Sequence, residues 1–270
     1  MAWTPLPSNA MSWEIEHKYG EQVHILDDGF LLTALARLSS PKSNRQEVLS
    51  LLRSVNQTLI TTAVGRELPT VGAEIPTRMN ELHPGQGVYT GKVFDPEQKV
   101  VVVDVIRGGI LPSQLCFELL TTVLPDENVR LDHLTMSRTT DSSGQVTGVD
   151  LSGSKIGGSV EGSTLIIPDP MGASGRTALR AVAFYEERFG SPEKILCLTT
   201  ICTPEFLKAV SNLHRNVSVY TARLDRGLSS PEVLRTMPGE RWDEERGLDD
   251  QSYIVPGAGG MGEILNNSWC

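Results

Sequence analysis

The stretch Thr164-Leu-Ile-Ile-Pro-Asp-Pro-Met-Gly-Ala-Ser-Gly-Arg-Thr-Ala178 joins an apolar run to a turn of small residues. Leu165 to Ile167 predict a strand, and the pattern from Ala178 to Phe189 predicts a helix after the turn. Backbone N–H groups in such a turn and at the start of the helix favour binding of a phosphate. Asp169, at the end of the strand, is suited to bind sugar hydroxyls or a hydrated metal ion. An ordinary strand-to-helix connection is the alternative.

A second unit of the same kind lies upstream. The β-branched run from Val100 to Ile106 predicts a buried parallel strand, and a helix is predicted from about Pro112 to Val123. Arg107-Gly108-Gly109 joins the two. An isolated arginine is most simply a solvated surface group, but the adjacent glycines favour an anion contact. Ligands of open α/β sheets bind at the carboxyl ends of the strands, where both loops are expected.

The remaining pattern alternates helices and strands, which predicts an α/β fold with a mainly parallel twisted sheet flanked by helices. The polar segment 139–162 is expected to form a flexible hairpin over the active site, with a passive surface hairpin as the alternative. The other predicted helices cover about residues 23–40, 45–62 and 204–213, and the other predicted strands cover residues 129–136, 194–201 and 217–221.

Length and composition indicate one globular domain over residues 21–270, preceded by a loose N-terminal arm over residues 1–20. The chain has 270 residues and a net charge of −9, which argues against general nucleic-acid binding. No apolar run approaches the length of a membrane span. The four cysteines form no CxxC pair, so we expect reduced thiols, a cytoplasmic location and no protein-held metal site.

The last part of the chain contains two near-copies, Asp225-Arg-Gly-Leu228 and Glu245-Arg-Gly-Leu248. They lie 20 residues apart, with a charged segment between them. The chain then runs through Tyr253-Ile-Val-Pro-Gly-Ala-Gly-Gly-Met-Gly-Glu263. A glycine-dense loop after an apolar strand can offer backbone N–H and C=O groups to the edge of a flat, polar base.

Taken together, these motifs resemble uracil phosphoribosyltransferase over about residues 21–267. The family usually has Leu-Arg-Ala-Gly where this chain has Ile106-Arg-Gly-Gly109, and Asp-Pro-Met-Leu-Ala-Thr-Gly-Gly-[Ser/Thr] where it has Asp169-Pro-Met-Gly-Ala-Ser-Gly-Arg-Thr177. Arg138 before the hairpin and Tyr253-Ile-Val-Pro-Gly257 also agree. The motif from Asp169 to Thr177 and the motif from Tyr253 to Gly257, at this separation, are the specific part of the resemblance.

The resemblance implies a reaction of pyrimidine salvage. Uracil attacks 5-phosphoribosyl 1-diphosphate, with Mg²⁺ bound to this donor, and the products are UMP and diphosphate. The implied catalytic residues are Arg107, Arg138 and Asp169. The implied donor-binding residues are Arg107, Gly109, Arg138, Asp169, Pro170, Met171, Gly172, Ala173, Ser174, Gly175, Arg176 and Thr177. The implied base-binding residues are Tyr253, Ile254, Gly259, Gly260 and Met261. The partners are then the donor and a pyrimidine base, with a homodimer or higher homo-oligomer expected.

Several positions depart from the family pattern. Gly260 replaces an aspartate that contacts donor and base, and Glu263, three positions later, is a candidate to compensate for it. Gly172 and Arg176 replace the usual Leu and Gly. Against the family pattern the chain also has an insertion at about residues 226–246, which is expected at the rim of the base pocket, as a lid, a specificity wall or a subunit contact. Two alternatives stay open: transfer to a different base, and a nucleotide-binding regulator without turnover.

Overall fold

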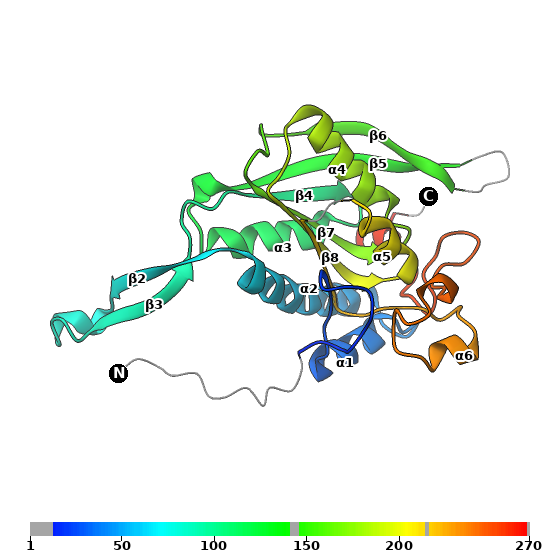
Figure 1. Cartoon of the computed structure of the whole chain (residues 1–270), viewed down its shortest axis with the longest axis horizontal. Helices are drawn as coiled ribbons and strands as arrows, with labels where there is room; N and C mark the ends of the chain where they lie inside the picture. Colours follow the sequence, from blue (N-terminus) through cyan, green and yellow to red (C-terminus); the bar gives the residue numbers. More distant parts are fainter. Residues whose placement is uncertain (1–12, 141–145, 214–215, 269–270) are drawn as a thin grey trace.

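A seven-stranded sheet forms the centre of the molecule (Figure 1), in the order β1-β9-β8-β7-β4-β5-β6. The computed structural model describes residues 13–140, 146–213 and 216–268. All neighbouring strands pair in parallel except β5 and β6, which are antiparallel. The strands are β1 (Val23–Ile25), β4 (Val100–Ile106), β5 (Val129–Thr140), β6 (Val146–Lys155), β7 (Thr164–Gly172), β8 (Lys194–Cys202) and β9 (Val217–Thr221). The predicted fold class is therefore confirmed.

Strand β4 shows why the central strands are largely apolar. Val101, Val103 and Val105 belong to the hydrophobic core on one face of the sheet. Val100 and Val102 belong to the core on the other face. Successive side chains of a strand point to opposite faces, so a strand covered on both sides favours apolar residues along most of its length. The buried Asp104 interrupts the run, and its carboxylate lies 2.8 Å from Nδ1 of His133.

Helices cover both faces. The helices α1 (Gly29–Leu38), α2 (Arg45–Glu67) and α3 (Ile110–Thr121) contribute to one core. The helices α4 (Arg176–Arg188) and α5 (Pro204–Val210) contribute to the other. In the part of the chain that the structure describes, no helix combines the length and apolarity needed to cross a membrane.

The start of the chain differs from the prediction in two places. The predicted helix over residues 23–40 is wrong in its first part, because Val23–Ile25 forms the edge strand β1 and pairs with β9. The helix begins only at Gly29, after the N-cap Asp28, whose side chain accepts from the N–H of Leu31. The predicted helix at about residues 45–62 is confirmed as α2, which Asn44 caps in a reciprocal capping box with Glu47.

The expectation of a loose arm over residues 1–20 is wrong for residues 13–20, while residues 1–12 lie outside the described part. Ile15 donates its N–H to the carbonyl of Ile25 at 2.9 Å. Trp13 stacks on His24, and Tyr19 is buried in the core. Burial of these aromatic side chains thus fixes residues 13–20 against the body of the protein.

A two-stranded ribbon projects from the body of the molecule (Figure 1). It is formed by β2 (Thr70–Pro76) and β3 (Val88–Phe94), which are antiparallel, with the short helix η1 (Arg78–Glu81) at its tip. Apolar side chains are exposed along it: Val71, Ile75, Met79, Leu82 and Tyr89.

The insertion folds around a buried carboxylate. Glu245 is 1% exposed, and its Oε1 accepts from Arg226 at 2.7 Å and from the N–H of Gly239 at 2.9 Å. The hydroxyl of Tyr19 donates to its other oxygen. The short helices α6 (Pro231–Leu234) and η3 (Trp242–Glu244) lie in this segment. The insertion therefore packs against the N-terminal segment.

The remaining elements are a hairpin and two short helices. The predicted segment 139–162 is largely the second strand of a hairpin, β5–β6, whose residues 141–145 lie outside the description. Closure of this hairpin over the site stays a prediction. A short helix, η2 (Asp126–Asn128), precedes β5, and α7 (Met261–Asn266) follows the glycine-rich loop.

Candidate functional site

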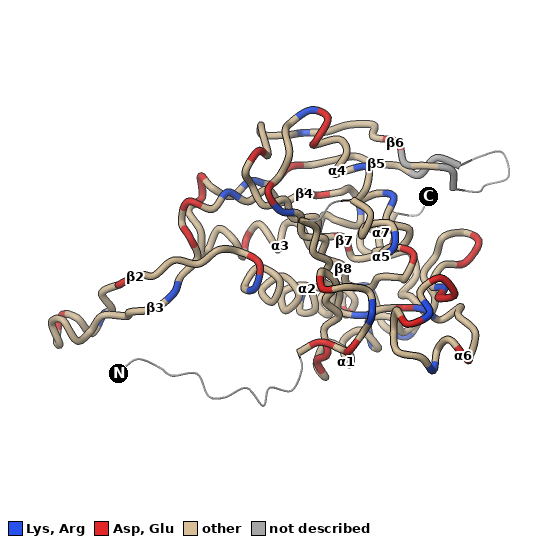
Figure 2. The backbone as a smooth tube through the Cα atoms, in the orientation of Figure 1, with Lys and Arg blue, Asp and Glu red and all other residues tan. Residues whose placement is uncertain are grey.

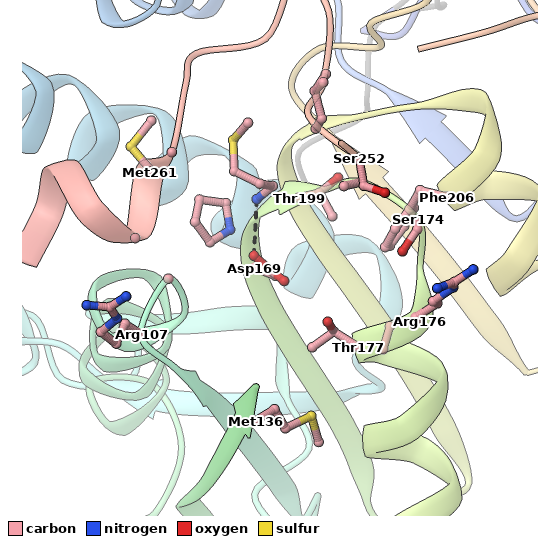
Figure 3. Close-up of a pocket in the computed structure, with 18 of the residues that line it drawn as sticks. Arg107, Met136, Asp169, Ser174, Arg176, Thr177, Thr199, Phe206, Ser252 and Met261 are labelled. Atoms are coloured by element: carbon pink, nitrogen blue, oxygen red, sulfur yellow. Dashed lines mark hydrogen bonds between the residues drawn. The ribbon is translucent and has the colours of Figure 1, made fainter. Parts of the chain in front are cut away.

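A cavity of about 780 Å³ opens at the carboxyl ends of β4, β5 and β7 (Figure 3). Five chain segments that are distant in the sequence contribute to it. Its lining includes Ile106, Arg107, Gly108, Thr135, Met136, Ser137, Asp169, Pro170, Met171, Ala173, Ser174, Gly175, Arg176, Thr177, Ser252, Tyr253, Ile254, Gly259, Gly260, Met261, Gly262 and Glu263. Both predicted strand–loop–helix units therefore meet the glycine-rich loop in one place.

Hydrogen bonds hold the end of β7 and the start of the loop that follows it. Asp169 Oδ1 accepts from the N–H of Met171 at 3.1 Å (Figure 3). The hydroxyl of the buried Thr203 donates to the carbonyl of Ala173 at 2.6 Å. The N–H of Thr203 also donates to Gly172 at 3.1 Å. Thr203, the N-cap of α5, thereby fixes the loop conformation.

The first turn of α4 faces the cavity. Its N-cap, Gly175, has φ +75° and offers no side-chain acceptor to the N–H groups of that turn. A Cβ on Gly175 would lie 2.8 Å from that of Ala209, so glycine is required here for space as well as for conformation. Uncapped N–H groups and the helix dipole suit an anion. Arg176 and Thr177 lie beside them (Figure 3).

Arg107 lies on the other side of Asp169 from Arg176 (Figure 3). Its Nη1 donates to the carbonyl oxygen of Ser268 at 3.0 Å and to the Ser268 hydroxyl at 2.8 Å. Gly108 brings the two loops together, because a Cβ there would lie 3.6 Å from Pro170 and 3.8 Å from Asp169. The cavity therefore has a guanidinium group at two of its sides and a carboxylate between them.

The insertion does not line the cavity, so of its three expected roles that of a specificity wall is wrong, while the lid and the subunit contact stay predictions. The apolar strand expected before the glycine-rich loop is reduced to a single bridge between Ile254 and Leu248. The two ends of the insertion hold this segment. The N–H of Gly227 donates to the carbonyl of Val255 at 3.0 Å, and the N–H of Val255 donates to Gly247 at 2.8 Å. This support positions Ile254, which is 7% exposed, at the cavity wall.

Most of the predicted site residues line the cavity, but Gly109 and Gly172 do not. Gly109 starts α3, and a Cβ there would lie 2.8 Å from the backbone of Val105. Gly172 is buried, and its Cβ would lie 2.8 Å from Thr199. Both glycines allow close packing behind the site rather than contact with a ligand. The side chain of Arg138 is outside the described part, so its predicted role stays a prediction.

Several lining residues were not predicted as site residues. Thr135, Met136 and Ser137 lie in β5 just before Arg138, where the parallel pairing of β5 with β4 ends at Thr135. That position, at the carboxyl end of a parallel strand, was the available sequence signal. Cys197, Thr199 and Phe206 also contribute. No local pattern marks those three, because they reach the cavity from β8 and α5.

Cys197 is not suited to act as a nucleophile. Burial, together with the negative charge of Asp169, raises the pKa of its thiol to about 12. A thiol with such a pKa stays protonated at neutral pH, and only the thiolate reacts readily. Cys116, Cys197 and Cys202 are all buried and unpaired, while Cys270 lies outside the described residues.

The described residues contain no group of three or more His, Cys, Asp or Glu side chains placed to hold a metal ion. A magnesium ion bound mainly by the phosphates of a ligand needs only one or two protein carboxylates. Asp169 and Glu263 are the carboxylates that line the cavity, so they fit an ion of that kind.

The fold and the site together define a phosphoribosyltransferase. The family model "Uracil phosphoribosyltransferase" matches residues 25–240, and the chain belongs to that family. A uracil phosphoribosyltransferase of Dictyoglomus turgidum is 24% identical over 243 residues, covering 90% of this chain and 98% of the relative. One of Variovorax paradoxus is 28% identical over 245 residues, covering 90% and 97%.

A solved structure supports the fold independently. The AQ2163 protein from Aquifex aeolicus superposes with a TM-score of 0.67 at 20% identity, covering 90% of this chain and 97% of that one. The overlap includes nearly the whole length of both chains, so the arrangement of the sheet and helices is shared.

Proposed function

We propose that this protein transfers the phosphoribosyl group of 5-phosphoribosyl 1-diphosphate to uracil, giving UMP and diphosphate. The observation that carries the proposal is the single cavity in which the loop from Asp169 to Thr177, Arg107 and the glycine-rich loop meet. An anion-binding turn, a separate cation and a backbone-rich pocket match the three parts of the reacting pair: 5-phosphate, diphosphate and base.

The 5-phosphate is proposed to bind at the first turn of α4. Ser174 and Thr177 add hydroxyl donors to the uncapped N–H groups of that turn, and Arg176 adds a positive charge. Asp169 lies near the end of β7, just before that turn, where its carboxylate can accept hydrogen bonds from ribose hydroxyls. Charge-assisted hydrogen bonds of this kind are stronger than neutral ones.

Arg107 is proposed to bind the diphosphate and to stabilise the charge that develops as it leaves. It must exchange at least part of its contact with Ser268 to do so. Arg138 is proposed for the same role, on the resemblance alone. Because bond breaking at the sugar carbon creates separated charges, positioning and electrostatic stabilisation carry the catalysis, and no covalent nucleophile is required.

Uracil is proposed to bind against the backbone of Ile254 and Gly259, with Tyr253 beside the ring. Both Ile254 and Gly259 line the cavity, and Tyr253 is 44% exposed. Backbone N–H and C=O groups have fixed positions there and can match the acceptor–donor–acceptor edge of uracil.

Magnesium is proposed to enter with the donor, coordinated mainly by diphosphate and ribose oxygens. It would neutralise charge on the leaving diphosphate. We also propose a location in the cytoplasm. The three buried free thiols support it, because free thiols persist in reducing compartments.

A homodimer or larger homo-oligomer is also proposed, with the β2–β3 ribbon at the contact. The ribbon projects from the body, exposes several apolar side chains and carries few charged ones (Figure 2). Exposed apolar area of this kind typically marks an interaction surface. Replacing Leu82, which is 73% exposed, and Ile75 by Ser should then reduce the molecular mass measured by light scattering.

The test is incubation of the purified protein with Mg²⁺, 5-phosphoribosyl 1-diphosphate and uracil, with UMP and diphosphate measured together. Equal formation of both products supports the proposal. Arg107→Ala should lower kcat/KM by about 100-fold or more, because it removes a charged contact to the leaving group. Arg37→Ala is the control, since this exposed arginine of α1 pairs only weakly with Glu47.

Transfer to a different base is the second candidate, favoured by Gly260 in place of the family aspartate. In that case uracil yields no UMP, while a screen of heterocycles releases diphosphate with one of them. Donor binding without diphosphate release from any base would instead indicate the regulator.

A further inference from the structure

The carboxylate of Glu263 occupies the space that a side chain on residue 260 would fill. A Cβ built on Gly260 would overlap Oε2 of Glu263 and lie 3.0 Å from its Cδ. These are distances shorter than van der Waals contact. The oxygen therefore lies about where an aspartate at position 260 would place its own carboxylate.

Helix geometry explains how a residue three positions away reaches this place. Gly260 is the N-cap of α7, and Glu263 is the third residue of the helix. Side chains of a helix lean toward its N-terminus, and residues three apart lie on one face. The Glu263 side chain accordingly bends back over the first turn, and the absence of a side chain on Gly260 leaves room for it.

The carboxylate faces the cavity without a protein partner. Glu263 is half-buried and lines the cavity. Among the described residues, its side chain makes no hydrogen bond or ion pair, including none to the backbone N–H of Gly260. A carboxylate that is partly removed from water favours a ligand that donates a hydrogen bond to it.

The neighbouring loops place this acceptor beside the donor site. A Cβ on Gly262 would lie 3.8 Å from the N–H nitrogen of Gly108, and one on Gly108 would lie 3.8 Å from Asp169 Oδ1. The start of α7 thus touches the Arg107 loop, which in turn touches the strand end that carries Asp169.

We propose that Glu263 supplies the carboxylate of this part of the site, accepting a hydrogen bond from an O–H or N–H group of the bound reactants. The inference rests on the proposed function. The donor group is either a ribose hydroxyl of 5-phosphoribosyl 1-diphosphate or an N–H of the base. Gly260 is then required, because any side chain there would displace the Glu263 carboxylate.

The test compares Glu263→Gln, Glu263→Ala, Gly260→Asp and the double variant Gly260→Asp/Glu263→Ala with the wild type. Calorimetry measures the Kd of Mg²⁺-bound 5-phosphoribosyl 1-diphosphate alone, and steady-state kinetics measures KM for uracil. Glu263→Gln and Glu263→Ala should each weaken one of these about 10- to 100-fold. A change in the donor Kd identifies a ribose hydroxyl, and a change confined to the KM for uracil identifies the base.

The double variant is the decisive comparison. Gly260→Asp alone should also weaken binding, because its side chain collides with the Glu263 carboxylate and repels it. In the double variant the new aspartate has the vacated space, so the lost affinity should largely return. Glu97→Gln, at an exposed turn before β4, is the control for changing a glutamate and should match the wild type.

Three results overturn the inference. If Glu263→Gln and Glu263→Ala match the wild type while UMP is formed, the proposed function stands and Glu263 has no role in binding. If Gly260→Asp and Glu263→Ala simply add their losses, the two positions do not share one space in the working site. A wild-type protein that binds neither the donor nor uracil overturns this inference and the proposed function together. Melting temperatures verify that all variants fold.

Discussion

Asp225 binds the backbone of Gly257: its Oδ2 accepts from the Gly257 N–H at 2.8 Å. Arg223 pairs with the same carboxylate through two bonds of 2.7 Å, and its Nη2 donates to the Gly257 carbonyl at 3.0 Å. One buried ion pair therefore satisfies both backbone polar groups of a residue in the glycine-rich loop. Asp225, the first residue of the near-copy Asp225-Arg-Gly-Leu228, therefore holds the loop that ends at Glu263.

Replacing Asp225 by Ala should reduce the free energy of unfolding by about 3 kcal/mol, because the partly buried Arg223 and the Gly257 N–H would both lose their partner. Chemical denaturation measures this change. The KM for uracil should also rise, since the loop carries the proposed base contacts.

The exposed Asp250 provides the control, because it lies close in sequence to the same loop. Asp250→Ala should leave stability within about 0.5 kcal/mol of the wild type. Equal losses in the two variants would contradict a specific role for the Asp225–Gly257 bond.

Gly257→Ala should destabilise the protein by about 2 kcal/mol or more. Gly257 has φ +61°, and a Cβ there would overlap the carbonyl of Ile254. Gly65→Ala is the matched substitution in the last turn of α2, where a Cβ meets nothing within 4 Å. It should stabilise the protein by about 0.5 to 1 kcal/mol, because alanine favours helix. Thermal unfolding of both variants tests this opposite pair of signs.

Restoring the usual family residue at position 172 should harm this protein. Gly172→Leu would place a side chain against Thr199, Cys202 and Phe206, where even a Cβ lies between 2.8 and 3.2 Å from its neighbours. Overpacking of this kind costs about 1–3 kcal/mol. The melting temperature should therefore fall. An unchanged or higher melting temperature would show that the loop and α5 can separate at little cost.

Alkaline pH should destabilise the protein through its buried thiols. Burial raises the pKa of Cys202 to about 12, so the folded state keeps this proton while the unfolded chain loses it above about pH 9. Stability therefore falls as pH rises from about 9 toward 12. A single such thiol contributes at most about 1.4 kcal/mol per pH unit. Urea denaturation at pH 8.5 and 9.5 should show a shallower decline for Cys202→Ala, and an unchanged decline would contradict the assignment.

Local patterns were sufficient to predict the parallel sheet. The predicted strand over Val100 to Ile106 coincides with β4, and the predicted strand over Val217 to Thr221 coincides with β9. Burial on both faces favours apolar residues at most positions, and that preference is visible within a single strand. Strand β1 was not predicted, because three residues at a sheet edge are too few to show a pattern distinct from that of the helix that follows.

Part of the site was also predictable from the sequence. Loops between a parallel strand and its helix must gather at one edge of the sheet, so Arg107 and the turn around Ser174 could be placed together from sequence. Contributions from β8 and α5 could not, because Thr199 and Phe206 have no chemical pattern that differs from core residues.

The sequence by itself determined the α/β class, the two strand–loop–helix units and the loops that bring phosphate-type donors to one cavity, because these depend on residues close together along the chain. Only the tertiary structure decided which side chains pack against one another around these elements. It places Tyr19 on Glu245, 226 positions apart, and fills the space at Gly260 with the carboxylate of Glu263. Such pairings depend on how helices and loops pack in three dimensions, and packing is not encoded in spacing along the chain.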